Sequence, residues 1–183
     1  HNVTILTGRG NQADELSDPT ALCDILEILN PSHIIIGPGP GSPSDSLLSK
    51  AISTHALAQQ IECSVLGICL GHQSIAEMAN GVVVKSPNGA VHGTPIQCHH
   101  DGKGLFEGLN SPQPFTRYNS LTVSIDEDSS SLSILARDEN GEIMALQHNS
   151  LPIFSVQFHP ESIGSPNGKK LLENFLGFNR MLE

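Results

Sequence analysis

The residues with the clearest chemical potential lie where a short apolar run meets a helical pattern, at Gly67-Ile68-Cys69-Leu70-Gly71. The form Gly-x-Cys-x-Gly is the thiol counterpart of the Gly-x-Ser-x-Gly turn, in which small flanking residues expose a nucleophile between a strand and a helix. The unpaired N–H groups that begin the following helix favour a thiolate. A lone cysteine is more often a small core residue, but the two glycines and the strand end favour a nucleophile here.

A cysteine nucleophile needs a base and a group that orients the base. The segment FSVQFHPES supplies His159 at the end of an expected strand and Glu161 two positions later. Pro160 restricts His159 to extended backbone, and residues i and i+2 of an extended segment lie on one side. A lone histidine is more often structural. Together with Cys69, the pair predicts a Cys-His-Glu triad.

A third segment, IIIGPGPGSP, offers backbone groups in place of reactive side chains. A loop rich in glycine and proline suits a plain turn, but it also lets a substrate approach the main chain closely. Beside a thiolate, a glycine N–H of this loop and the N–H of Leu70 can stabilise a tetrahedral oxyanion.

These three segments follow apolar runs that alternate with helical patterns. We expect strands at 2–6, 32–37, 63–68 and 152–158, and helices at 18–30, 44–60, 70–80 and 166–181. Asp18 and Ser165 are the expected N-caps of the first and last of these helices. This order predicts a parallel sheet wrapped by helices on both faces, with ligands at the carboxyl ends of its strands. Short β-like pieces between 82 and 155 predict an antiparallel addition.

Composition and charge limit the classes of partner. The chain has 183 residues, 38% of them hydrophobic, and a net charge of −10. The length suits one domain over residues 1–183, and the acidic charge argues against nucleic acid or an anionic membrane as main partner. No apolar run approaches the ~18 residues of a membrane span, and no secretory signal opens the chain.

The four cysteines (Cys23, Cys63, Cys69 and Cys98) show no Cys-x-x-Cys spacing. Reduced thiols in a cytosolic-type compartment are therefore favoured over disulfides. The segment CHHD at 98–101 raises a metal site as an alternative. Adjacent residues of one strand point to opposite faces, and no second ligand cluster accompanies them, so no metal is expected.

GICLGHQ, QFHPES and GPGPGSP together resemble the class I (triad) glutamine amidotransferase domain, and the resemblance covers nearly the whole chain. It implies a flavodoxin-like, doubly wound, mainly parallel sheet. It also implies hydrolysis of the side-chain amide of glutamine through a γ-glutamyl thioester, with the released ammonia passed to a synthase partner.

Carried over by motif, this resemblance makes Cys69 the nucleophile, His159 the general base and acid, and Glu161 the group that orients His159. The N–H groups of Leu70 and Gly39 would form the oxyanion hole. Gly41 and Gln73 would hold the glutamine head group. RYNSLTV at 117–123 resembles the family's segment whose backbone grips the substrate, and the residues assigned there are Ser120 and Leu121. No cofactor and no metal are expected in this chain.

Within the family, GPGPGSPSD, HHDGKGLFEGL, RYNSL and QFHPESIGSPNGKKLLENFL resemble the amidotransferase component of anthranilate synthase and of aminodeoxychorismate synthase. The implied partner is a chorismate-using synthase, as a separate subunit or a fused domain, and the partner is expected to use Mg²⁺. Anthranilate synthase, in tryptophan biosynthesis, is favoured on resemblance only. Aminodeoxychorismate synthase, in folate biosynthesis, and transfer to an isochorismate-type product stay open. The expected location is cytoplasmic, or a plastid in a plant.

Three features depart from the family pattern. A further strand and helix usually precede HNVTIL, and their loss would expose a core edge, so either upstream residues exist or the domain is cut from a longer chain. The segment after VHG is short, which affects the expected partner contact. Asn119 stands where histidine is usual, which should matter little if only backbone atoms bind substrate there.

Two alternatives come from other functional classes. A stand-alone hydrolase such as a γ-glutamyl peptidase would use the same triad, but Gln73 and the likeness to chorismate-linked members argue against it. A catalytically silent regulatory or scaffold domain tends to lose the cysteine or the histidine. Here Cys69, His159 and Glu161 are all present.

Overall fold

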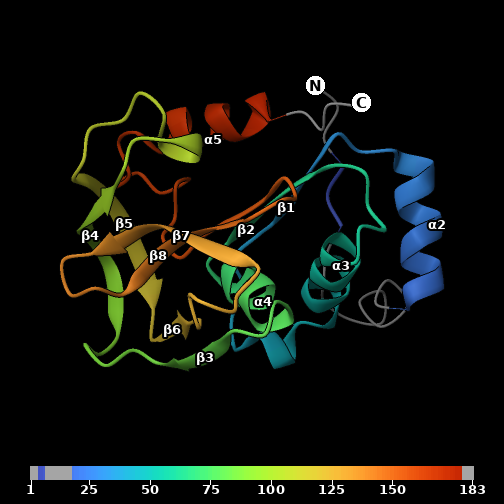
Figure 1. The fold of residues 1–183 in the computed structure, drawn as a ribbon, viewed down its shortest axis with the longest axis horizontal. Helices are drawn as coiled ribbons and strands as arrows, with labels where there is room; N and C mark the ends of the chain where they lie inside the picture. The colour runs from blue at the N-terminus through green and yellow to red at the C-terminus, as the bar shows by residue number, and fades with distance from the viewer. Residues whose placement is uncertain (1–3, 7–17, 179–183) are drawn as a thin grey trace.

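The computed structural model describes residues 4–6 and 18–178 (Figure 1). Its elements in chain order are α2 (Pro19–Leu29), β1 (His33–Ile36), η1 (Pro43–Asp45), α3 (Leu47–Leu57), β2 (Ser64–Ile68), α4 (Leu70–Met78), β3 (Val82–Lys85), β4 (Val91–His100), η2 (Gly104–Phe106), β5 (Gln113–Asn119), β6 (Leu121–Ser124), β7 (Leu132–Asp138), β8 (Ile143–His148), β9 (Ile153–Val156) and α5 (Gly168–Gly177). The strand expected at 2–6 lies partly outside the described residues, and residues 4–6 form no strand. None of the helices in the described part of the chain is long and apolar enough to span a membrane.

Most strands of the described residues form one sheet, in the order β1-β2-β9-β8-β7-β4-β5. The first three are parallel, with Ile36 opposite Gly67 and Ile68 opposite Val156. From β9 onward, the pairs are antiparallel. The α/β class with a parallel core is confirmed. The antiparallel addition has two parts, because four strands extend the main sheet while β3 and β6 pair separately.

Helices cover both faces of the parallel strands, as predicted. Val65 of β2 packs in one cluster with residues of α2, α3 and α4, among them Ile52. The next residue, Leu66, packs in another cluster with Phe175 of α5. Successive side chains of a strand point to opposite faces, so β2 is buried on both sides. Figure 1 shows α5 well apart from α2 and α3.

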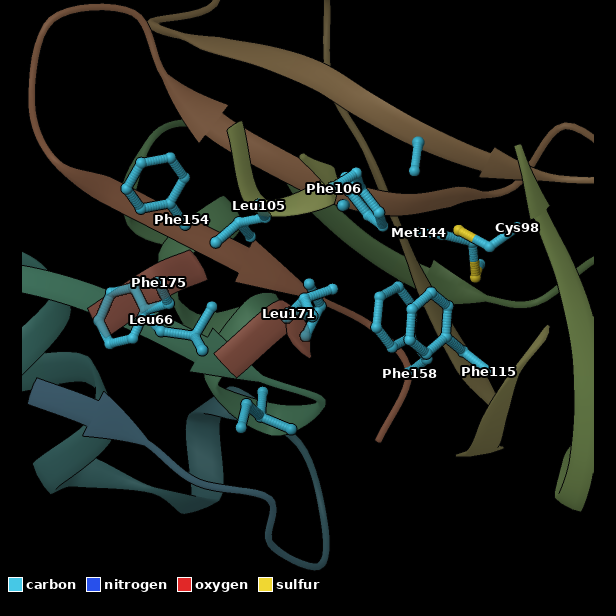
Figure 2. Packing of buried hydrophobic residues seen from close by; sticks show 14 of the residues in the cluster. Leu66, Cys98, Leu105, Phe106, Phe115, Met144, Phe154, Phe158, Leu171 and Phe175 are labelled. Atoms are coloured by element: carbon cyan, nitrogen blue, oxygen red, sulfur yellow. The ribbon is translucent and has the colours of Figure 1, made fainter. Parts of the chain in front are cut away.

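The larger core lies beside α5 and is rich in aromatic side chains (Figure 2). The rings of Phe115 and Phe158 stack with centroids 4.0 Å apart, and Phe106 meets Phe115 edge-on at 6.3 Å. Phe158 is fully buried and directly precedes the predicted base, His159. Buried aromatic pairs hold their backbone firmly, so this core fixes the segment that presents His159.

Candidate active site

The turn between β2 and α4 has the geometry that Gly-x-Cys-x-Gly predicts. Cys69 has φ 53° and ψ −98°, a combination that persists only where the surroundings enforce it. Its N–H donates to the carbonyl oxygen of Val156 at 2.9 Å, which ties the turn to β9. A Cβ on Gly67 would meet the backbone of Gly71, and a Cβ on Gly71 would meet the carbonyl of Ile36. The glycines therefore let α4 begin against β1 and β2.

His159 is held by its backbone and by its ring. Its N–H donates to the carbonyl oxygen of Thr116 at 2.8 Å, and its carbonyl accepts from Oγ of Ser165 at 2.6 Å. Nδ1 of the ring lies 2.6 Å from Oε1 of Glu161. The predicted His159–Glu161 contact is therefore formed.

Ser165 does not cap the last helix, contrary to expectation. Its hydroxyl donates to His159 and accepts from the N–H of Thr116 at 3.0 Å. The N-cap of α5 is Asn167. The N-cap of α2 is Asp18, as predicted, since its Oδ1 accepts from the N–H groups of Thr20 and Ala21.

The charge state of His159 follows from its neighbours. Burial lowers the pKa of His159, but its interactions with Cys69 and with Glu161 outweigh burial and raise its pKa to about 9. Burial raises the pKa of Glu161, and its bond to His159 outweighs that effect and keeps the pKa below its usual value. Because Nδ1 faces Glu161, the nitrogen left for the thiol is Nε2, which is buried and has no hydrogen bond among residues 4–6 and 18–178. The imidazole therefore carries both protons at neutral pH.

A pocket of about 180 Å³ opens at the carboxyl ends of β1 and β2. Seven of the nine predicted site residues line it: Gly39, Gly41, Cys69, Leu70, Gln73, Ser120 and Leu121. His159 and Glu161 are not in the lining, and His159 meets the site through Cys69. This volume is below the range of drug-sized sites, roughly 300–1,000 Å³, and suits one amino-acid side chain.

Four further lining residues were not predicted: Pro40, His92, Tyr118 and Asn119. Pro40 lies in the segment IIIGPGPGSP, and Tyr118 and Asn119 lie in RYNSL, so the sequence motifs already indicate that these residues are near the site. His92 reaches the pocket only because β4 pairs with β5, which puts it opposite Tyr118. No local pattern marks that pairing.

The glycine-rich loop lies directly against the start of α4. A Cβ on Gly39 would come 2.9 Å from Cδ2 of Leu70. Gly41 has φ 84°, which favours glycine. The carboxylate of Asp45 accepts from the N–H and the hydroxyl of Ser42, both at 2.8 Å, and fixes the following turn. Gly39 and Leu70 thus lie side by side.

Asn119 makes side-chain contacts that a purely backbone role would not require. Its Oδ1 accepts from Nε of Arg117 at 3.0 Å, and its Nδ2 donates to the carbonyl oxygen of Leu121 at 2.7 Å. Arg117 is fully buried and forms ion pairs with Asp138 at 2.7 Å and Glu142 at 2.8 Å. The residue at position 119 therefore helps to shape the pocket segment that follows it.

The CHHD segment at 98–101 is used in packing. Burial, together with Asp138, raises the pKa of the Cys98 thiol far above its usual value. The ring of His100 stacks on Phe106 with centroids 4.3 Å apart. No group of three or more His, Cys, Asp or Glu side chains placed to hold a metal occurs in the described part of the chain.

Replacing Glu161 with glutamine tests the source of the raised pKa of His159. The variant keeps the size but removes the charge, so we expect the pKa of His159 to fall below about 9. A raised pKa means that His159 stabilises the fold fully below its unfolded pKa of about 6.5, and that this stability is lost as pH rises through about 9. In the variant that loss should begin at lower pH.

An NMR titration of the His159 ring measures this change. Glu173→Gln is the matched control, since Glu173 lies on α5 in an exposed pair with Lys169 at 3.7 Å. We expect the control to leave the titration unchanged. An unchanged titration in Glu161→Gln would show that Cys69 alone sets the pKa of His159.

The fold and the site define an α/β enzyme with a cysteine at a strand-to-helix turn and a histidine–glutamate pair beside it. The family model for glutamine amidotransferase class-I matches residues 13–177. The chain therefore belongs to the class I glutamine amidotransferase family, as the motifs predicted.

The chain is similar to curated proteins named for two synthases. It is 43% identical over 153 residues to aminodeoxychorismate/anthranilate synthase component 2 of Bacillus subtilis, covering 84% of this chain and 77% of that one. Identity is 42% over 154 residues to anthranilate synthase component 2 of Cyanophora paradoxa, covering 84% and 79%. The chain is also 41% identical over 160 residues to aminodeoxychorismate synthase component 2 of Klebsiella aerogenes, covering 87% of this chain and 83% of that one.

A solved structure supports the fold independently. The crystal structure of a protein described as a GMP synthase subunit, from Thermoplasma acidophilum, superposes with a TM-score of 0.72 at 22% identity, covering 85% of this chain and 75% of that one. At this identity the likeness concerns the fold alone, and it agrees with the mixed α/β architecture.

Proposed function

We propose that this chain is the glutamine-hydrolysing component of a chorismate-using synthase, with anthranilate synthase as the first choice. The observation that carries this proposal is the pocket, which gathers Cys69 and the residues expected to hold glutamine. The relatives' names include both anthranilate and aminodeoxychorismate synthase. Aminodeoxychorismate synthase is therefore the second candidate.

In the first half-reaction, Sγ of Cys69 attacks the side-chain amide carbon of glutamine. The carbonyl oxygen becomes an oxyanion, to which the N–H groups of Gly39 and Leu70 donate. His159, protonated at neutral pH because its pKa is about 9, transfers a proton to the amide nitrogen. The C–N bond breaks, ammonia leaves, and a γ-glutamyl thioester stays on Cys69.

In the second half-reaction, the now neutral imidazole of His159 takes a proton from water, whose oxygen attacks the thioester. The C–S bond breaks, glutamate leaves, and Cys69 returns to the thiolate while His159 keeps the proton. Glu161, 2.6 Å from Nδ1 of His159, orients the ring and stabilises its charged form. Glutamine is held by Gly41, Gln73, Ser120 and Leu121.

No step of this reaction needs a cofactor from this chain, and Mg²⁺ is assigned to the synthase partner. A bifunctional protein named TrpGD from Thermotoga maritima is 41% identical over 151 residues, and the chain covers 25% of it. The relatives therefore include proteins named as separate components and a protein named as bifunctional. The cysteines Cys23, Cys69 and Cys98 form no disulfide in the part of the chain that the structure describes, which supports a reducing compartment, the cytoplasm or a plant plastid.

The test is glutamate release from glutamine by the chain alone, with a component 1 of anthranilate synthase, and with a component 1 of aminodeoxychorismate synthase. We expect hydrolysis of glutamine but not of asparagine, a faster rate with a synthase component, and anthranilate formed from chorismate. Absence of glutamate release in all three conditions would refute the proposal. Release that neither synthase component raises would refute the partner, and aminodeoxychorismate as the only product would select the second candidate.

A further inference from the structure

We propose that Gln157 is a further catalytic residue, whose side-chain amide donates a hydrogen bond to Sγ of Cys69 and stabilises the thiolate. The inference rests on the proposed function. Gln157 directly follows β9, two residues before His159, and is fully buried. Its Nε2 lies 3.7 Å from Sγ of Cys69.

The position of Gln157 is fixed on two sides. Its backbone N–H donates to the carbonyl oxygen of Met144 at 2.9 Å. Its Oε1 accepts from Nε2 of Gln73 at 3.1 Å. One end of the side-chain amide thus meets a residue of the pocket, and the other end meets the nucleophile.

The orientation of the amide follows from donor and acceptor chemistry. The carbonyl oxygen of Leu121 can only accept, so the Gln73 atom 3.3 Å from it must be the NH₂ group. That same NH₂ group meets Gln157, which must therefore present its oxygen to Gln73. The NH₂ group of Gln157 is left facing the sulfur. A flipped amide would oppose two NH₂ groups and place an oxygen against the thiolate.

The far end of this chain of hydrogen bonds is anchored as well. A guanidinium can only donate, so Asn119 presents its oxygen to Arg117 and its NH₂ group to Leu121. The carbonyl of Leu121 then accepts from Asn119 and from Gln73, which fills both lone pairs. The side-chain amides between the buried Arg117 and the sulfur are those of Asn119, Gln73 and Gln157. Each has only one orientation in which its donors and acceptors match their partners.

A hydrogen bond to a thiolate is charge-assisted and therefore stronger than one to a neutral thiol. In a buried site the difference is larger than in water. The amide of Gln157 therefore favours the ionised nucleophile and makes Cys69 more reactive. Because the contact is to the reacting atom itself, its loss should change the reactivity of Cys69 without any substrate present.

Alkylation of Cys69 by iodoacetamide over a pH series tests this inference, with mass spectrometry of the Cys69 peptide to separate it from other thiols. In Gln157→Met, which keeps the size without the donor, we expect alkylation at pH 7 to slow about 10-fold or more.

An alkylation profile of Gln157→Met equal to that of wild type would overturn the inference. If Gln157→Met does not fold, Gln157→Asn keeps an amide but shortens its reach, and the same slowing is expected. Gln147→Met on β8, outside the pocket lining, is the matched control and should alkylate as wild type does. A wild-type Cys69 no more reactive at pH 7 than Cys98 would refute the proposed function itself.

Discussion

Cys69→Ser is expected to reduce glutamine hydrolysis at least about 1,000-fold while the fold stays intact. Serine nearly matches cysteine in size, so the strained turn at φ 53° and the packing around it are retained. The hydroxyl does not ionise beside an imidazole as a thiol does. The residual activity should therefore come only from substrate binding and from the proposed oxyanion donors, the N–H groups of Gly39 and Leu70.

The measurement is glutamate release under saturating glutamine, with intact-protein mass spectrometry to detect the γ-glutamyl adduct that only the wild type should form. Cys98→Ala is the matched control, because Cys98 is a buried thiol on β4 outside the pocket lining. It should cost some stability but keep the activity. If Cys69→Ser retained more than about a tenth of the activity, Cys69 would not be the nucleophile.

The parts of this site that the sequence predicts best are those whose geometry is local. Gly67, Cys69 and Gly71 are close in sequence, and the close approach of strand and helix that they permit is a property of a few residues. The contact between His159 and Glu161 spans two positions, with Pro160 restricting the backbone between them. Such spacing constrains geometry before any tertiary contact is known.

The parts that the sequence does not predict depend on long-range pairing. His92 lines the pocket because the register of β4 against β5 places it opposite Tyr118. The local pattern around Ser165 predicts an N-cap, but its hydroxyl instead accepts a hydrogen bond from the N–H of Thr116, which is 49 positions away in the chain. A tertiary partner of this kind overrides a local capping preference.

Arg117 shows the same limit more clearly. In β5 the charged Arg117 is buried and its neighbour Tyr118 is half-exposed, the reverse of what residue type alone suggests. The reason is that Asp138 and Glu142, at the turn between β7 and β8, place two carboxylates against the guanidinium. Neither carboxylate can be assigned to Arg117 from the sequence, because the pairing exists only after the four strands β5, β4, β7 and β8 have assembled.

Arg117→Met is accordingly expected to have the largest effect on stability, a loss of about 3–5 kcal/mol in the free energy of unfolding at pH 7. Methionine fills a similar volume but leaves the carboxylates of Asp138 and Glu142 buried without their cation. The side chains of Asp138 and Glu142 are 2% and 4% exposed. It also removes the bond that holds Asn119. We therefore expect a higher KM for glutamine in whatever fraction folds.

Urea unfolding followed by circular dichroism measures this cost, and Arg137→Met is the matched control. Arg137 lies on β7 and pairs with Glu127 at 2.6 Å, with side chains 41% and 63% exposed. An exposed pair contributes about 0–1 kcal/mol. If Arg117→Met does not fold, Arg117→Lys keeps the charge without the planar fork and should lie between wild type and methionine. A loss no larger than that of Arg137→Met would contradict the prediction.

The cost of Arg117→Met should also depend on pH in a definite direction. Burial raises the pKa of Glu142, but hydrogen bonds from Ser86 and Asn88 and the charge of Arg117 keep it below its ordinary value of 4.5. In the wild type, Glu142 therefore stabilises the fold above that value, and this stability is lost only as pH falls through the lowered pKa.

Without Arg117 the pKa of Glu142 rises, and the charged carboxylate becomes costly at pH 7. Protonation relieves that cost as pH falls, so the difference between wild type and variant should be smaller at pH 5 than at pH 7. A difference that stays constant between these pH values would show that lost packing, and not the unpaired carboxylates, destabilises the variant.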